Sequence, residues 1–255
     1  MPQRRSLLSE RLPISCNDYA DVVLLIDMST YIETRSKVTN YFSRFLRSFL
    51  LRFVRLLDIR PGRIQLSAVT YATSGHVVFP LTSDAIEVYT KLNNLTFEST
   101  AAGSGKNLSD ALHLVKTKVL NVDASNYRHD STNVIVVIGD GAETDSTTRA
   151  QMHAHELLLL GALIIAVPVT PDQDQKELEL VASPAADLNR PGASESVKHG
   201  GFVQMSAGGE VPSEVEAAIV VNKAIRIHSL MKCADRSTAE SGEFIISRFD
   251  DMSCA

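Results

Sequence analysis

Three short, uninterrupted apolar runs rich in β-branched residues constrain the fold of this chain more than any other feature. They are ADVVLLID at residues 20–27, TNVIVVIGDG at 132–141 and ALIIAVPVT at 162–170. Runs of this kind, without polar alternation, are typical of strands buried on both faces of a parallel sheet. Helical patterns separate the runs, so we expect a doubly wound α/β domain with helices on both faces of the sheet.

Two further signals complete a predicted six-stranded, mostly parallel sheet. Residues 63–73 and 76–82, joined through Ser74 and Gly75, predict a tight hairpin and hence one antiparallel edge strand. GFVQMS at 201–206 predicts the sixth strand.

The predicted helices leave most of the chain in one domain. They cover residues 33–56, 83–95, 108–120, 145–160, 173–184 and 214–231. Ser83 is the expected N-cap of the helix that follows it. We expect residues 1–17 to form an N-terminal extension, 18–232 the α/β domain and 233–255 a cysteine-containing ribbon or linker.

Length and charge limit the classes of function. A chain of 255 residues, 44% hydrophobic and 22% charged, suits one large domain with at most a small appendage. Its net charge of −5 argues against a dedicated nucleic-acid binder. We find no apolar run long enough to span a membrane. Residues 1–16 lack the apolar core of a secretory signal, so we expect either a fragment or mature form, or a protein that stays inside the cell.

The predicted helix at residues 33–56 carries a basic stripe. Arg44, Arg47, Arg52 and Arg55 fall within an arc of roughly 140° on one helical face. A solvated helix face is the first interpretation, and a contact site for a sulfated glycan, an anionic lipid or an acidic protein is the alternative.

The three cysteines flank the predicted domain body. Cys16 precedes it, and Cys233 and Cys254 follow it. Cysteines at the two ends of a domain whose termini meet suggest a disulfide clasp, and therefore an oxidising, extracellular compartment.

Unusual polar residues follow three predicted elements that converge on one edge of the sheet. Asp27 and Ser29 follow the first strand, Lys106 and Asn107 end the loop GSGKN, and Asp140 follows the fourth strand. Ligands bind at the carboxyl ends of strands in such sheets. The loop is not a phosphate-binding loop, because that motif requires glycine where Thr100 stands and a hydroxyl residue where Asn107 stands.

The motifs IDMS and GDG occur together with the order of elements described above. In this combination the sequence resembles the von Willebrand factor A domain family over about residues 21–231. The family carries a metal-ion-dependent adhesion site for Mg²⁺ or Mn²⁺. The resemblance implies that Asp27, Ser29 and Asp140 are metal ligands. It further implies that Tyr31, Lys106, Asn107 and Glu143 lie on the ligand-binding surface.

Two positions depart from the motif of that family. Tyr31 stands where the second serine belongs, and Lys106 stands where a threonine belongs. Two neighbouring carboxylates destabilise a fold unless a cation lies between them, and the Lys106 ammonium is able to supply that cation. We therefore expect Mg²⁺ or Mn²⁺ binding to be weak or lost. In the alternative, Lys106 points to solvent and Asp27, Ser29, Asp140 and water hold Mg²⁺ weakly.

A narrower resemblance concerns the adhesive domain of the thrombospondin-related anonymous protein family of apicomplexan gliding adhesins. CNDYADVVLLIDMS, NLSDAL and LMKC resemble the entry, the third-helix start and the last-helix end of that domain. It implies a cell-surface ectodomain in which Cys16 pairs with Cys233 or Cys254.

Adhesion is therefore the leading hypothesis for function. We expect a non-enzymatic module that binds an extracellular protein or a sulfated glycan, and no nucleic acid. The alternative is an intracellular, metal-independent scaffold with the same fold. Catalysis lacks support, because Ser29 has no G-x-S-x-G elbow and the scattered histidines, His153 and His155 included, lack the H-E-x-x-H spacing.

Overall fold

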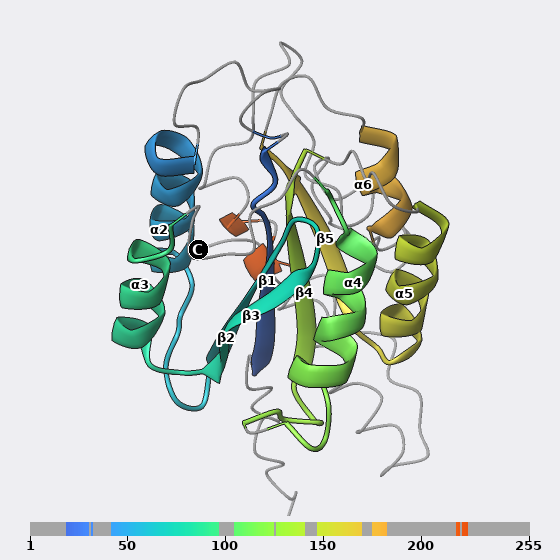
Figure 1. Cartoon of the computed structure of the whole chain (residues 1–255). Coiled ribbons are helices and arrows are strands. Elements are labelled where there is room, and N and C mark those ends of the chain that lie inside the picture. The colour runs from blue at the N-terminus through green and yellow to red at the C-terminus, as the bar shows by residue number, and fades with distance from the viewer. Residues whose placement is uncertain are drawn as a thin grey trace, which may run out of the picture.

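The sheet is built around strand β1 (Ala20–Asp27), which has a parallel neighbour on each side (Figure 1). The computed structural model describes residues 19–30, 32, 42–96, 105–124, 126–140, 147–169, 175–182, 218–219 and 221–223. The other strands are β2 (Ile64–Tyr71), β3 (Gly75–Thr82), β4 (Thr132–Gly139) and β5 (Leu163–Pro168). Within the described residues, five strands follow the order β3-β2-β1-β4-β5.

The register of the strands brings their carboxyl ends to one edge. Asp27 of β1 lies opposite Tyr71 of β2, and Gly139 of β4 lies opposite Pro168 of β5. Strand β3 is antiparallel to β2 and begins at Gly75, directly across from Tyr71. The predicted mostly parallel sheet with one antiparallel edge strand is therefore confirmed. Its parallel order places the polar residues that follow β1 and β4 side by side.

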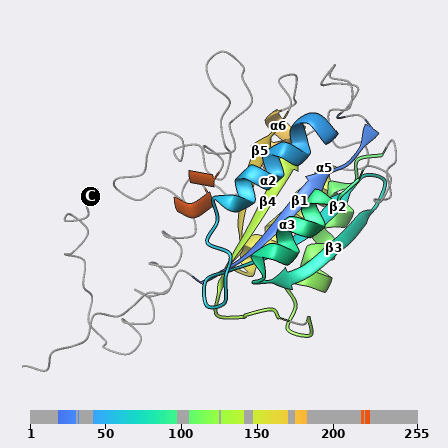
Figure 2. The same ribbon diagram turned by 90° about the vertical axis from the view of Figure 1, so that its left-hand side faces the viewer.

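Helices cover both faces of the sheet, as Figure 2 shows for α2 and α3 on one face. The helical segments are η1 (Phe42–Leu46), α2 (Arg47–Arg55), α3 (Ala85–Asn93), α4 (Leu108–Leu114), η2 (Val115–Val119), α5 (Thr147–Leu159) and α6 (Gln175–Val181). In β1, Val22, Leu24 and Ile26 pack in the cluster that contains α2 and α3, whereas Val23 and Leu25 pack in the cluster that contains α4 and α5. Strands buried on both faces explain the continuous apolar runs in the sequence.

The N-cap of α3 is Asp84. Its side chain accepts hydrogen bonds from the backbone amides of Ile86 and Glu87 at 2.8 and 3.1 Å. The prediction that Ser83 caps this helix is therefore wrong by one residue. Asp84 has the extended backbone that a cap needs, and its carboxylate reaches two amides at once.

Several predicted elements lie partly or wholly outside the described residues. Residues 42–55 of the predicted helix at 33–56 are helical, and residues 218–219 and 221–223 are helical within the predicted helix at 214–231. The predicted strand at 201–206 and the predicted domain boundaries lie outside the described part of the chain. None of the helices in the described part is long and apolar enough to cross a membrane.

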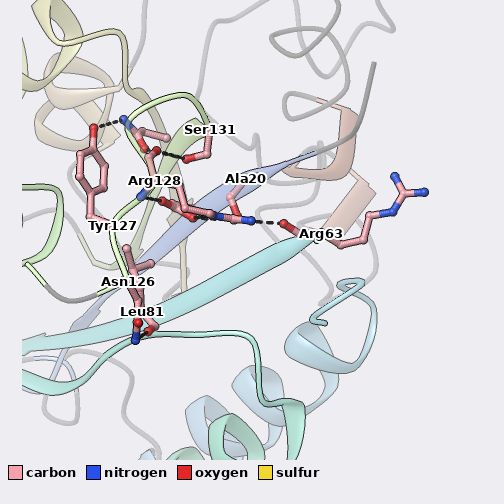
Figure 3. Close-up of polar contacts among 9 residues, drawn as sticks. Ala20, Arg63, Leu81, Asn126, Tyr127, Arg128 and Ser131 are labelled. Atoms are coloured by element: carbon pink, nitrogen blue, oxygen red, sulfur yellow. Dashed lines mark hydrogen bonds and ion pairs between the residues drawn. The ribbon is translucent and has the colours of Figure 1, made fainter. Parts of the chain in front are cut away.

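Arg128, in the segment before β4, links to the amino-terminal ends of β1 and β2 (Figure 3). Its guanidinium donates to Asp21 Oδ1 at 2.6 Å, to the Ala20 carbonyl at 2.8 Å and to the Arg63 carbonyl at 3.1 Å. Its backbone amide donates to Asp21 Oδ2 at 3.0 Å. Asp21 is fully buried, so this pair fixes the start of the central strand at the end of the sheet opposite the predicted site.

Candidate functional site

The turn after β1 positions Asp27 and Ser29. Asp27 is the last residue of the strand, and its Oδ1 accepts a hydrogen bond from the Ser29 backbone amide at 2.8 Å. The Met28 amide donates to the Tyr71 carbonyl at 2.8 Å, which keeps the turn attached to β2. Both polar side chains are buried, and the Ser29 Oγ has no hydrogen-bond partner among the described residues.

Gly139 allows the two aspartates to come together. It is the last residue of β4, immediately before Asp140. A Cβ atom at position 139 would lie 2.8 Å from the Tyr71 hydroxyl and 3.1 Å from the Asp27 Cβ. Both distances are shorter than ordinary van der Waals contact, so a side chain at position 139 would force Tyr71 or Asp27 to shift.

Backbone contacts around α4 position Lys106. The amide of Asn107 donates to the Ala72 carbonyl at 2.7 Å, which ties the loop to the end of β2. The Asn107 side chain accepts from the Asp110 amide at 2.9 Å and so caps α4. Gly105 lies against Thr73, where an added Cβ would be 3.1 Å from the Thr73 Cα. Lys106 is thereby held at the carboxyl edge of the sheet.

The Lys106 ammonium lies against both aspartates. Nζ donates to Asp140 Oδ1 and lies 3.5 Å from Asp27 Oδ2. The side chains of Lys106, Asp27 and Asp140 are only 2%, 1% and 0% exposed. Burial raises the pKa of the Asp27 carboxyl, and the nearby Lys106 charge offsets part of that effect. One cation and two carboxylates therefore form a buried ionic cluster.

The residues of this cluster do not fit a divalent metal ion while Lys106 lies among them. A hard cation such as Mg²⁺ requires several oxygen ligands in a near-octahedral shell. Here an ammonium group contacts one carboxylate and lies close to the other. No three His, Cys, Asp or Glu side chains in the described ranges are arranged to hold a metal ion.

The structure brings together four of the predicted site residues, Asp27, Ser29, Lys106 and Asp140. Asn107 adjoins them as the cap of α4. Lys106 is buried, unlike in the alternative that pointed it to solvent. The remaining predicted site positions, which are Tyr31, Glu143, Cys16, Cys233 and Cys254, lie outside the described residues.

The predicted basic stripe is partly described. Arg52 and Arg55 are exposed on α2, and the Arg44 side chain lies outside the described part. Arg55 donates to the Tyr89 hydroxyl at 2.7 Å and stacks over its ring, 4.7 Å from the ring centre. Packing between α2 and α3 therefore engages one member of the stripe, which sequence reasoning had not indicated.

The fold and the site define a doubly wound domain of the class that binds ligands at the carboxyl ends of its strands. The sequence profile of the von Willebrand factor type A domain matches residues 21–198, and the chain belongs to that family. Membership in this family of adhesion-type domains supports a non-enzymatic binding role.

Two curated relatives and two solved structures illustrate the relationship. The chain is 26% identical over 180 residues to the collagen alpha-4(VI) chain of Mus musculus and 30% identical over 134 residues to integrin alpha-2 of Bos taurus. These matches cover 69% and 52% of this chain but only 7% and 10% of the relatives.

The structural matches show the shared fold. Manganese-loaded Plasmodium vivax TRAP protein superimposes with a TM-score of 0.63 and 16% identity, over 82% of this chain and 74% of that one. Proximal thread matrix protein 1 from the mussel byssus gives a TM-score of 0.56 and 19% identity, over 64% of this chain and 41% of that one.

Proposed function

We propose that this domain is a non-enzymatic adhesion module that binds a protein or sulfated-glycan partner without a divalent cation. The observation that carries the proposal is the buried Lys106 ammonium, which donates to Asp140 and lies 3.5 Å from Asp27 Oδ2. The partner would contact the surface around Asp27, Ser29, Lys106 and Asp140, with Tyr31, Asn107 and Glu143 at its rim.

Electrostatics provides the physical reason. Two buried carboxylates attract a cation, and at 3.5 Å one unit charge interacts with another by about 5 kcal/mol at an effective dielectric constant near 20. Lys106 supplies that positive charge from within the chain, so no free cation has to be ordered at the site. A divalent ion would have to displace the ammonium before it gained ligands. The position between the two carboxylates is therefore already taken by a cation, and the site offers no open coordination position to an acidic ligand.

We further propose that the domain is extracellular or lies on a cell surface, as a relative of the gliding adhesins. Similarity to a collagen chain and an integrin subunit supports this setting, as do the cysteines at both ends of the domain. The competing role is a metal-independent scaffold inside the cell. Mass analysis under non-reducing conditions separates the two, because one closed disulfide supports the ectodomain and three free thiols support the scaffold.

Calorimetric titration with Mg²⁺ and Mn²⁺ tests the metal-independent site. The chelator-treated native protein is compared with the Tyr31→Ser/Lys106→Thr double variant and with each single variant. We expect no binding to the native protein and measurable binding to the double variant. The Tyr31→Ser variant is the matched control, because it retains the ammonium and should not bind. Binding of Mg²⁺ by the native protein would overturn the proposal and make metal-coordinated recognition of an acidic ligand the better account.

A further inference from the structure

A hollow between α4 and α5 shares only Asn107 with the proposed partner-binding surface. The two helices lie side by side on one face of the sheet (Figure 1). The hollow has a volume of about 220 Å³ and is lined by Asn107, Ser109, Asp110, His113, Arg149 and His153. It therefore combines two imidazoles, one from each helix, with room for a small ligand.

The two imidazoles have the spacing of a shared metal ion. The ring centres of His113 and His153 are 5.0 Å apart, with 49° between the ring planes. In a tetrahedral zinc site each nitrogen lies about 2.0–2.1 Å from the metal, which puts two bound imidazole ring centres about 5 Å apart. The observed separation therefore matches joint coordination of one ion.

Glu156 determines which nitrogen of His153 is available. His153 Nδ1 lies 3.0 Å from Glu156 Oε2, and Lys116 Nζ donates to the same oxygen at 2.9 Å. A carboxylate that already takes a hydrogen bond from Lys116 acts as an acceptor towards His153 as well. A His153 ring that donates from Nδ1 to this carboxylate has its free lone pair on Nε2. Metal-binding histidines are oriented by a carboxylate in this way.

We propose that His113 and His153 form a binding site for a transition-metal ion of borderline softness, Zn²⁺ or Cu²⁺. Imidazole nitrogen suits these ions, whereas Mg²⁺ and Ca²⁺ prefer oxygen. No third His, Cys, Asp or Glu in the described ranges converges with the two rings closely enough to complete the site. Water molecules complete the coordination shell of the ion, and a side chain of a binding partner is able to replace one of them. This site is independent of the Asp27 cluster and of the proposed function.

Arg149 provides a way to distinguish this site from an anion site in the same hollow. Arg149 is exposed at the rim of the hollow. Its positive charge opposes a bound cation and would favour a bound carboxylate or sulfate. Arg149→Gln should therefore strengthen zinc binding, whereas an anion site would be weakened by the same change.

Zinc titration of the chelator-treated intact chain tests the proposal, with free thiols alkylated beforehand so that cysteine does not compete. We expect one Zn²⁺ per chain at pH 7.5. His113→Ala and His153→Ala should each weaken binding at least about ten-fold, and Glu156→Gln about ten- to a hundred-fold. His155→Ala is the matched control, because His155 lies on the same helix but does not line the hollow.

A spectroscopic measurement makes the test independent of stability. Electron paramagnetic resonance of the Cu²⁺-loaded protein should show coupling to two imidazole nitrogens, reduced to one in His113→Gln. Equal loss in His155→Ala, unchanged binding in the His113→Ala/His153→Ala double variant, or no detectable zinc binding would each overturn the proposal.

Discussion

Lys106 Nζ lies 3.5 Å from Asp27 Oδ2, in a part of the domain where neither side chain is more than 2% exposed. The same ammonium donates to Asp140, which directly follows the neighbouring strand β4. A buried ionic group is costly to leave unpaired, so each member of this cluster depends on the others. The loop before α4, the end of β1 and the end of β4 are therefore coupled through one side chain.

Removal of the Lys106 charge should strongly destabilise the domain. Lys106→Met leaves two carboxylates buried together without a cation, and the loss of one partner of a buried pair costs about 3–5 kcal/mol. Urea unfolding at neutral pH measures the change. The Lys106→Met/Asp140→Asn double variant is the control, because it removes one of the two negative charges and should recover part of the loss. No difference between the two variants would contradict ionic coupling.

Gly139→Ala should disturb the same cluster by steric means. The new Cβ would lie 2.8 Å from the Tyr71 hydroxyl and 3.1 Å from the Asp27 Cβ. Overpacking of this kind costs about 1–3 kcal/mol. Thermal unfolding should show the loss, and Tyr71→Phe in the Gly139→Ala background should relieve part of it by removing the hydroxyl. Tyr71→Phe alone serves as the reference. If the two changes simply add, the predicted clash is absent.

Arg128→Ala should destabilise the opposite end of the sheet. The change leaves the fully buried Asp21 carboxylate without its guanidinium and removes the hydrogen bonds to the Ala20 and Arg63 carbonyls. We expect a loss of about 3–5 kcal/mol in the free energy of unfolding.

A surface pair provides the control for Arg128→Ala. Arg60 Nε lies 2.8 Å from Asp58 Oδ1, and both side chains are more than half exposed. Because exposed pairs contribute little, Arg60→Ala should leave the urea midpoint unchanged. Similar changes in the urea midpoint of the two variants would mean that the burial of Asp21 does not determine the loss of stability.

Glu156 should contribute a stability term that is lost in acid. Its pKa is lowered from 4.5 to about 2 in the folded protein by hydrogen bonds from His153 and Lys116. The folded state therefore binds this proton less readily than the unfolded state. The stabilisation is fully present above pH 4.5 and declines as the pH falls towards 2.

Unfolding curves of the native protein and of Glu156→Gln across this range measure that term. The native protein should be more stable at pH 6, and the difference should shrink as the pH falls from 4.5 towards 2. Added salt should reduce the difference at pH 6, because Lys116 and Glu156 are both about one-third exposed. A difference that stays constant with pH would contradict the prediction.

For the described part of the chain, the sequence predicted the type and order of the elements, because each strand buried on both faces needs a continuous apolar run. The run at residues 20–27 corresponds to β1 without change of boundary, and the run at 132–141 corresponds to β4, which ends two residues earlier at Gly139. The polar residues after those runs also predicted where a site would lie, since parallel strands bring their carboxyl ends to one edge. The N-cap of α3 was misplaced by one residue because Ser83 and Asp84 are both good caps, and only the backbone conformation at Asp84 separates them.

Contacts between side chains of different elements depend on how those elements pack in three dimensions. Lys106 and Asp140 are separated by 34 positions, and Asp21 and Arg128 by 107, so no local pattern pairs them. The sequence raised two alternatives for Lys106, solvent or the space between two aspartates, because a long flexible side chain fits either pattern. The hydrogen bonds that tie its loop to β2 and α4 place it in the interior. The pairing of His113 with His153 depends in the same way on how α4 and α5 pack against one face of the sheet, which no spacing within either helix encodes.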